Sequence, residues 1–443
     1  MNRRAFLAGS AAAASVLALG RGAGALGRTK LGGTVKLHMP WPLATIDPHR
    51  LDDIGAAVLG EALFDTLYAR QEGGAFGPSL AESEPVPDGD ALRVVVRSGL
   101  ATAHGRAIDA RDAMSSLARA RAAGALAWLS SIGQPRLAGT DTLVFAGRDP
   151  ERLMRALASP LTAIVPIGFR PSLPDGTGPM RASRQGDALV LVRNGNAARG
   201  ASFLDQMFVR EAGGLDVSLR AFETGADDIG WLGSGYFDTR ADSRPFDAGA
   251  IGWAILCTGR EAGPGWDAPG VAQSVADSLP PSELGSFFLG PPWATSGVHG
   301  WGGPSCDLLV REDAPWLVEL AKTVAATLSS GNAVTARAVS PSEMTQRRAA
   351  RAYTLAMDVA RPLLHGALGA FAGLATADDP KAAVEALRYP PRGGDMSPRA
   401  LTRTMHLGVV GEIRVQGGRV PDLSLPVSTA SFGIDFGAAT RSR

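Results

Sequence analysis

The 443-residue sequence has little cysteine and no strong excess of either charge. Cys257 and Cys306 are its only cysteines, too few for a disulfide framework, and the spacing leaves open one bridge or two separate thiols. Lysine and arginine together number 44 against 43 acidic residues, so the formal net charge is +1. This balance argues against nucleic-acid binding, which needs a concentrated basic surface.

The short motifs of common catalytic and metal centres are also missing. There is no Gly-x-Ser-x-Gly elbow, no His-Glu-x-x-His pair and no Cys-x-x-Cys pair. GAGALG at 22–27 fits the dinucleotide pattern by letter, but no strand precedes it. The histidines are scattered along the chain: His38, His49, His104, His299, His365 and His406. We therefore expect a protein that is not an enzyme and that carries no metal ion or cofactor.

Residues 1–25 have the parts of a cleavable export signal. Arg3 and Arg4 are adjacent, and the apolar run at 6–19 is too short to span a bilayer. The paired arginines resemble the twin-arginine signal, which is read by the twin-arginine export machinery. An uncleaved N-terminal anchor is the alternative. Cleavage near Leu26 would remove three arginines and no acid, which changes the formal net charge from +1 to −2.

The rest of the chain mixes the patterns of helices and strands. Apolar residues at helical spacing predict helices at 55–68, 110–122 and 150–158. Short apolar or alternating runs predict strands at 34–39, 92–97, 143–146, 189–193 and 208–211. Asp109 followed by Asp112 is typical of a helix N-terminus. Interleaved strands and helices without a regular repeat predict a mixed α/β protein.

Four sequence segments, here called blocks, follow one another in an order that points to a known family. They are GGTVKLHMPWPLATIDPHR at 32–50, LGEALFDTLYAR at 59–70, GTGPM at 176–180 and SLRAFETGADDIGWL at 218–232. In wording and order these blocks resemble the family 5 substrate-binding proteins of ABC importers, the group that binds dipeptides, oligopeptides and nickel. The resemblance extends from residue 31 to about residue 285.

The resemblance implies a bilobal, type II periplasmic-binding-protein fold with mixed sheets and a small extra domain. One discontinuous lobe is expected at 31–48, 161–255 and 409–443, the inserted domain at 49–160, and the second lobe at 256–408. A ligand would be enclosed between the lobes, which would close by a hinge motion. The turn at Gly176, Gly178 and Pro179, where a side chain would obstruct a tight crossing and a positive φ is expected, is the predicted hinge.

The function that the resemblance implies is that of a periplasmic receptor, soluble after signal cleavage and monomeric. It would capture a peptide-like or other small organic solute and deliver it to the permease and ATPase of an ABC importer. An exported binding or sensory module without a transport role is the alternative, and it has the same fold.

The chain departs from the peptide-binding members of this family at a specific position. Those members carry Gly-Trp-x-x-Asp after a strand, and the Asp meets the free amine of the peptide. In RAYTLAMDVARPLLHG at 351–366, neither the Trp nor that Asp is in register. Asp358 is the nearby acid, but helical and strand spacing both turn it away from Tyr353. This predicts a ligand without a free amine, such as a blocked peptide or another amphipathic molecule.

Aromatic residues beside predicted turns are the candidate ligand contacts, because rings give large apolar contact at low entropic cost. The candidate ligand-binding residues are Trp41, Trp231, Trp253, Trp301, Tyr353 and Asp358. Trp41 and Trp301 are favoured because both are expected in loops. Core packing is the alternative for half or more of the tryptophans.

Overall fold

The computed structural model describes residues 31–231, 240–280, 284, 300–391, 393–428 and 433–442. The predicted export signal at 1–25 lies outside these residues. Within them, none of the helices combines the length and the apolar character that a membrane span needs.

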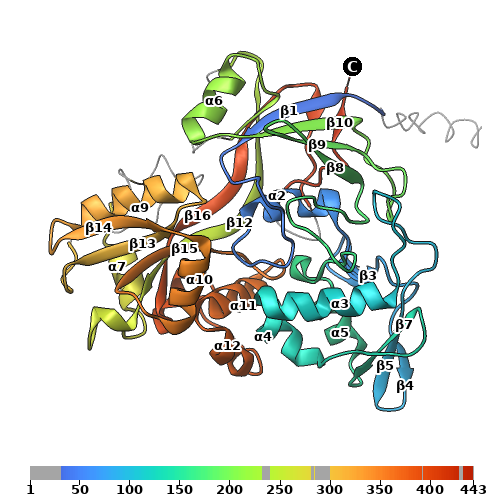
Figure 1. Cartoon of the computed structure of the whole chain (residues 1–443), viewed down its shortest axis with the longest axis horizontal. Coiled ribbons are helices and arrows are strands. Elements are labelled where there is room, and N and C mark those ends of the chain that lie inside the picture. The colour runs from blue at the N-terminus through green and yellow to red at the C-terminus, as the bar shows by residue number, and fades with distance from the viewer. Residues whose placement is uncertain are drawn as a thin grey trace, which may run out of the picture.

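A ten-stranded mixed sheet runs through the centre of the molecule (Figure 1), in the order β14-β13-β15-β12-β16-β11-β1-β10-β9-β8. In that order the strands are Val334–Val339, Cys306–Arg311, Leu355–Ala360, Arg244–Thr258, Leu407–Arg419, Ile229–Trp231, Thr34–Met39, Gln206–Glu211, Ala188–Arg193 and Met180–Gln185. β12 and β16 form a long antiparallel pair that joins the two halves of the sheet. Parallel pairs flank them, with β1 beside β10 and β11 on one side and β13 beside β14 and β15 on the other. Segments that are distant in the sequence therefore meet along this central pair.

Helices pack on both halves of this sheet (Figure 1). They are α2 (Ile54–Leu63), α6 (Leu215–Glu223), α7 (Val271–Asp277), α9 (Pro315–Leu328), α10 (Pro341–Ala350), α11 (Ala367–Asp378) and α13 (Pro398–Leu401). α12 (Pro380–Ala386) packs on α11. α6 lies on β1 and β11, α9 lies on β13 and β14, and α2 contacts both β12 and β8. The position of α2, close to the central strands, brings its N-terminus to the junction between the halves.

A separate four-stranded sheet has the order β4-β5-β7-β6. Its strands are Val86–Asp88, Ala91–Val95, Thr142–Ala146 and Arg136–Leu137, and the nearby helices are α3 (Ala110–Ala120), α4 (Leu126–Leu129) and α5 (Pro150–Leu157). Short pairs are formed by β2 (Tyr68–Arg70) with β3 (Phe76–Pro78), and by β17 (Leu423–Ser424) with β18 (Thr440–Arg441). The apolar core beneath the small sheet also contains Leu363 and Leu364, which follow β15. This unit is therefore packed against the half of the large sheet that contains β13, β14 and β15, called the second half from here on.

Most predicted elements are present within one or two residues. Asp109 and Asp112 form a capping box at the start of α3, each side chain accepting the backbone N–H of the other. The helix predicted at 55–68 is too long, because α2 ends at Leu63 and the chain then becomes extended into β2. Tyr68 is buried and pairs with β3, so tertiary packing overrides the helical spacing at this end.

Both cysteines are free thiols, which decides between the two alternatives left by the sequence. Cys257 lies on β12 and Cys306 on β13, with β15 between those strands. Burial raises the pKa of Cys257 to about 12, so this thiol stays protonated at neutral pH.

Candidate functional site

The loop at 40–53 leaves the carboxyl end of β1 and leads into α2. Asp53 is the N-cap of this helix: its Oδ1 accepts the N–H of Ala56 at 2.7 Å and its Oδ2 accepts the N–H of Asp47 at 2.8 Å. Burial raises the pKa of Asp53 to about 6. A single carboxylate therefore fixes both the fold of the loop and the start of the helix.

A buried polar group anchors the same loop to α3. Arg119 donates from Nη1 to Asp47 Oδ1 and to His49 Nδ1, both at 2.7 Å, and from Nη2 to Asp47 Oδ2. His49 Nε2 must donate to the carbonyl of Ala163 at 2.7 Å, so Nδ1 is the acceptor and the ring is neutral. Burial lowers the pKa of His49 to about 4, in agreement with a neutral ring. Burial also opposes the charge on Asp47, but Arg119 holds the pKa of that carboxyl below its usual range.

A first hollow of about 590 Å³ lies between this loop and the second half of the large sheet. Arg311, at the end of β13, pairs with Asp52 of the loop and with Asp313, whose Oδ2 lies 2.8 Å from Nη2. Arg50 pairs with Asp52 as well, at 2.6 Å. The two arginines of the first hollow thus have two carboxylates as partners, and one of these contacts joins the halves.

A second hollow of about 540 Å³ lies on another side of α2, and an adjoining one of about 260 Å³ shares Ala57, Pro160 and Arg361 with it. Arg199 lines the second hollow, and its Nε lies 2.5 Å from Oδ1 of the buried Asp65, whose Oδ2 accepts the Thr177 hydroxyl at 2.8 Å. Arg361, which follows β15, lines it too. The second hollow is thus lined by charged residues together with small and apolar ones.

Arg361 is only 5% exposed and connects the halves through backbone groups. Its Nη1 donates to the carbonyl of Arg50 at 3.3 Å and to that of Asp53 at 3.0 Å. Burial lowers the pKa of Arg361 to about 10, which still leaves the guanidinium protonated at neutral pH. In the part of the chain that the structure describes, Arg361 forms no ion pair within 4.0 Å.

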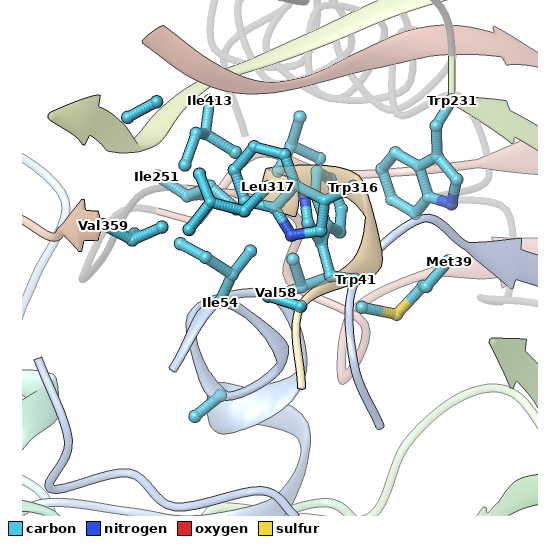
Figure 2. Packing of buried hydrophobic residues seen from close by; sticks show 14 of the residues in the cluster. Met39, Trp41, Ile54, Val58, Trp231, Ile251, Trp316, Leu317, Val359 and Ile413 are labelled. Atoms are coloured by element: carbon cyan, nitrogen blue, oxygen red, sulfur yellow. The ribbon is translucent and has the colours of Figure 1, made fainter. Parts of the chain in front are cut away.

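Apolar side chains complete the contact between the halves (Figure 2). Trp316 and Leu317 of α9 lie against Trp41 of the loop and Ile54 of α2. Trp41 in turn packs on Trp231, with ring centroids 5.5 Å apart. The junction between the halves is therefore a packed apolar layer beside polar hollows.

The predicted aromatic ligand contacts are all buried in cores, in two separate clusters. Trp41, Trp231 and Trp301 belong to the cluster that includes the loop and α2, whereas Trp253 and Tyr353 belong to the cluster on another side of the sheet. Trp301 packs on Trp266 and donates its indole N–H to a backbone carbonyl. The structure does not gather these residues around one space, and their role in ligand binding stays a prediction.

Asp358 lines the first hollow. Residue spacing predicted that its side chain would point away from Tyr353, and this prediction is wrong. Arg348 of α10 reaches both residues: its Nη1 is 3.0 Å from the Tyr353 hydroxyl and its Nε is 3.5 Å from Asp358 Oδ2. Tyr353 precedes β15, so strand alternation does not relate it to Asp358, and the long arginine bridges the two.

The turn at Gly176 and Gly178 is a close backbone crossing, as expected. A Cβ on Gly178 would lie 2.5 Å from the carbonyl carbon of Leu63, and one on Gly176 would lie 2.3 Å from the Leu63 oxygen. Neither glycine is among those with positive φ, so close approach and not the left-handed conformation requires glycine here. A hinge motion at this turn and Pro179 stays a prediction.

The residues that sequence reasoning missed are the charged ones around α2. Asp53 carried a usable signal, since an aspartate directly before an apolar helical run is a common N-cap. Arg311 and Arg361 each end or follow a buried strand, but nothing local in the sequence shows that both reach the same loop. Among the described residues, no group of three or more His, Cys, Asp or Glu residues could hold a metal ion.

Comparison with known proteins identifies the fold through structure alone. No family model and no curated protein sequence matches the chain. Among solved structures, DppA from Helicobacter pylori in complex with the peptide STSA, an ABC transporter-associated periplasmic binding protein, matches 94% of this chain and 99% of its own at 14% identity, with a TM-score of 0.68. AgaA in complex with agropinic acid, from A. tumefaciens R10, matches 93% and 99% at 14% identity and a TM-score of 0.68. NikA from Brucella suis, in complex with Fe(III)-EDTA, matches 93% and 100% at 15% identity and a TM-score of 0.63.

These matches span nearly the whole of each binding protein. The chain therefore has the bilobal α/β fold of periplasmic binding proteins, and the fold predicted from the ordered sequence blocks is confirmed. The bound molecules are chemically diverse, so the fold alone does not identify a ligand.

Proposed function

We propose that the chain is the exported substrate-binding protein of an ABC importer, which captures a small organic solute and delivers it to a permease and its ATPase. The observation that carries this proposal is the group of hollows at the junction between the halves of the sheet. Binding proteins of this fold have the same overall architecture, and Arg311 and Arg361 contact the loop at 40–53 across the junction.

The remaining parts of the proposal concern export and motion. The signal at 1–25 directs the chain through the twin-arginine machinery to the periplasm, where the mature protein is a monomer without catalytic activity. In this proposal the lobes have the bounds that the sequence resemblance implies, and the turn at 176–179 accommodates their closure. A solute shifts the protein toward the closed form only by binding that form more tightly than the open one.

A thermal-shift screen of defined solutes, followed by X-ray scattering with each solute that binds, tests receptor function. Free and N-acetylated peptides, amino-acid conjugates and metal chelates are first screened for an increase in Tm. A receptor is expected to bind at least one, and that solute should reduce the radius of gyration measured by X-ray scattering as the halves close. Binding without compaction, or no binding across the panel, would contradict the proposal.

A further inference from the structure

The arginines at the junction differ in their partners. Arg311 pairs with Asp52 and Asp313, and Arg199 pairs with the buried Asp65. Arg361 is more deeply buried, yet within the described residues it donates only to two backbone carbonyls, both through Nη1. A guanidinium has five N–H donors, so the Nε and Nη2 donors of Arg361 remain for another acceptor. A buried cation without an anion is costly unless something else compensates its charge.

Nearby carboxylates are already engaged elsewhere. Asp53 accepts two backbone N–H groups, and Asp47 is held by Arg119 in a bidentate pair. Both influence Arg361 only at longer range. Glu61 lines the second hollow as well, and its charge acts on Arg199. Among the described residues, no carboxylate therefore contacts Arg361 directly.

Two glycines allow neighbouring elements to pack closely around Arg361. A Cβ on Gly373 would lie 2.0 Å from the carbonyl oxygen of Arg361, so α11 can approach the backbone there only because residue 373 is glycine. Gly252 on β12 lies beside the aliphatic part of the side chain, and a Cβ there would be 3.6 Å from Arg361 Cγ. Close packing of the backbone and stem holds the guanidinium between the second hollow and the adjoining one.

We propose that the second hollow binds a solute that carries a carboxylate, and that Arg361 accepts this carboxylate with its remaining donors. This assignment rests on the proposed receptor function and specifies the substrate class of the same site. It also agrees with the absence of the acidic residue that would meet a free amine. The planar fork of arginine suits two parallel hydrogen bonds to one carboxylate, and closure excludes the water that would weaken them.

Calorimetric titration with matched acids and amides tests the carboxylate site. The probes are benzoate and benzamide, acetate and acetamide, and N-acetyl-dialanine and its C-terminal amide, all at one ionic strength. Wild-type protein is expected to bind at least one acid roughly 10-fold or more tightly than its amide, since hydrogen bonds to a charged group are strong in a dry site. Arg361→Gln should reduce that ratio to about 1.

Two further variants separate this role from folding. Arg361→Lys keeps the charge and should keep part of the acid preference, whereas Arg311→Gln removes the other bridging arginine and should leave that preference unchanged. No acid preferred over its amide, or a preference that survives Arg361→Gln, would overturn the carboxylate site. If a neutral or cationic solute compacts the protein while no acid is preferred, receptor function stands and only the carboxylate site fails.

Discussion

The first and second hollows lie on two sides of α2 and differ in how their charges are compensated. In the first hollow, Arg311 and Arg50 have Asp52 and Asp313 as protein partners. In the second, Arg361 is buried and has only backbone carbonyls. A fully paired group is typical of a structural contact, whereas a buried cation without an anion is costly to keep for structure alone. We therefore propose that the ion pairs of the first hollow stabilise the closed form, and that the second hollow recognises the ligand.

The largest expected effect disrupts the backbone crossing at the end of α2, the helix that lies between the two hollows. Gly178→Val places side-chain atoms against the backbone at the end of α2, where a Cβ alone would lie 2.5 Å from a carbonyl carbon. We expect a loss of about 3 kcal/mol in unfolding free energy, measured by urea denaturation. Gly195→Ala is the matched control, since nothing lies within 4 Å of a Cβ there. Equal stability of the two variants would show that the turn is not a tight crossing.

Arg119→Gln removes the support that both hollows share. Asp47 would be left buried without its cation, and His49 would lose a donor. A loss of about 2–3 kcal/mol is expected at pH 7 because an unpaired buried carboxylate is costly. Lowering the pH to about 4 should reduce this loss, since protonation of Asp47 removes its charge. A loss that does not change with pH would contradict the assignment to the ion pair.

His49→Gln tests the same support through pH. The pKa of His49 is lowered to about 4 in the folded protein against about 6.5 unfolded, so its favourable contribution is present above pH 6.5 and is lost as the pH falls toward 4. The stability of wild type relative to His49→Gln should therefore rise by about 2 kcal/mol between pH 4 and pH 6.5. Asp53, with its pKa raised to about 6, changes stability in the opposite direction over this range in both proteins. If the unfolding free energies of wild type and His49→Gln changed with pH in parallel, His49 would not be a buried neutral histidine.

The smallest effects compare the two bridging arginines directly. Arg311→Gln should lower the unfolding free energy by about 1 kcal/mol, because it breaks partly exposed ion pairs. Arg361→Gln should change it by less than about 0.5 kcal/mol or raise it, because an uncompensated charge leaves the interior while a donor for the carbonyls remains. Thermal and urea denaturation without added solute measure both changes. A larger loss for Arg361→Gln than for Arg311→Gln would reverse the assignment of the two hollows.

The sequence predicts the fold better than it predicts the site. The strand at 34–39 and the cap at Asp109 depend on local spacing, so they could be found without tertiary information. The helix predicted at 55–68 was too long because the burial of Tyr68 in β2 depends on a distant partner strand. The ordered blocks led to the bilobal fold through their resemblance to a known family, and in the structure they fall on β1, the end of α2, the turn at 176–179, and α6 with β11.

Site residues could not be found in the same way, because they come from three segments that only the tertiary structure brings together. Residues 47–53, Arg119 and Arg361 are separated by long stretches of chain, and the loop meets the two arginines only after folding. Trp41 and Trp231 fill the core where α9 and the loop meet, and their large apolar area is buried there, so their role in ligand binding stays a prediction.

Native mass spectrometry of protein purified from the periplasm of an exporting host tests the central claim most directly. If the chain is an exported receptor whose second hollow holds an acid, the wild-type spectrum should contain a complex with one small molecule, and tandem spectra should show that this molecule carries a carboxylate. Arg361→Gln should give the bare protein mass, while Arg311→Gln should retain the molecule. A bare wild-type protein that also binds none of the solutes offered would contradict receptor function, and an adduct that is unchanged in Arg361→Gln would contradict the assigned site.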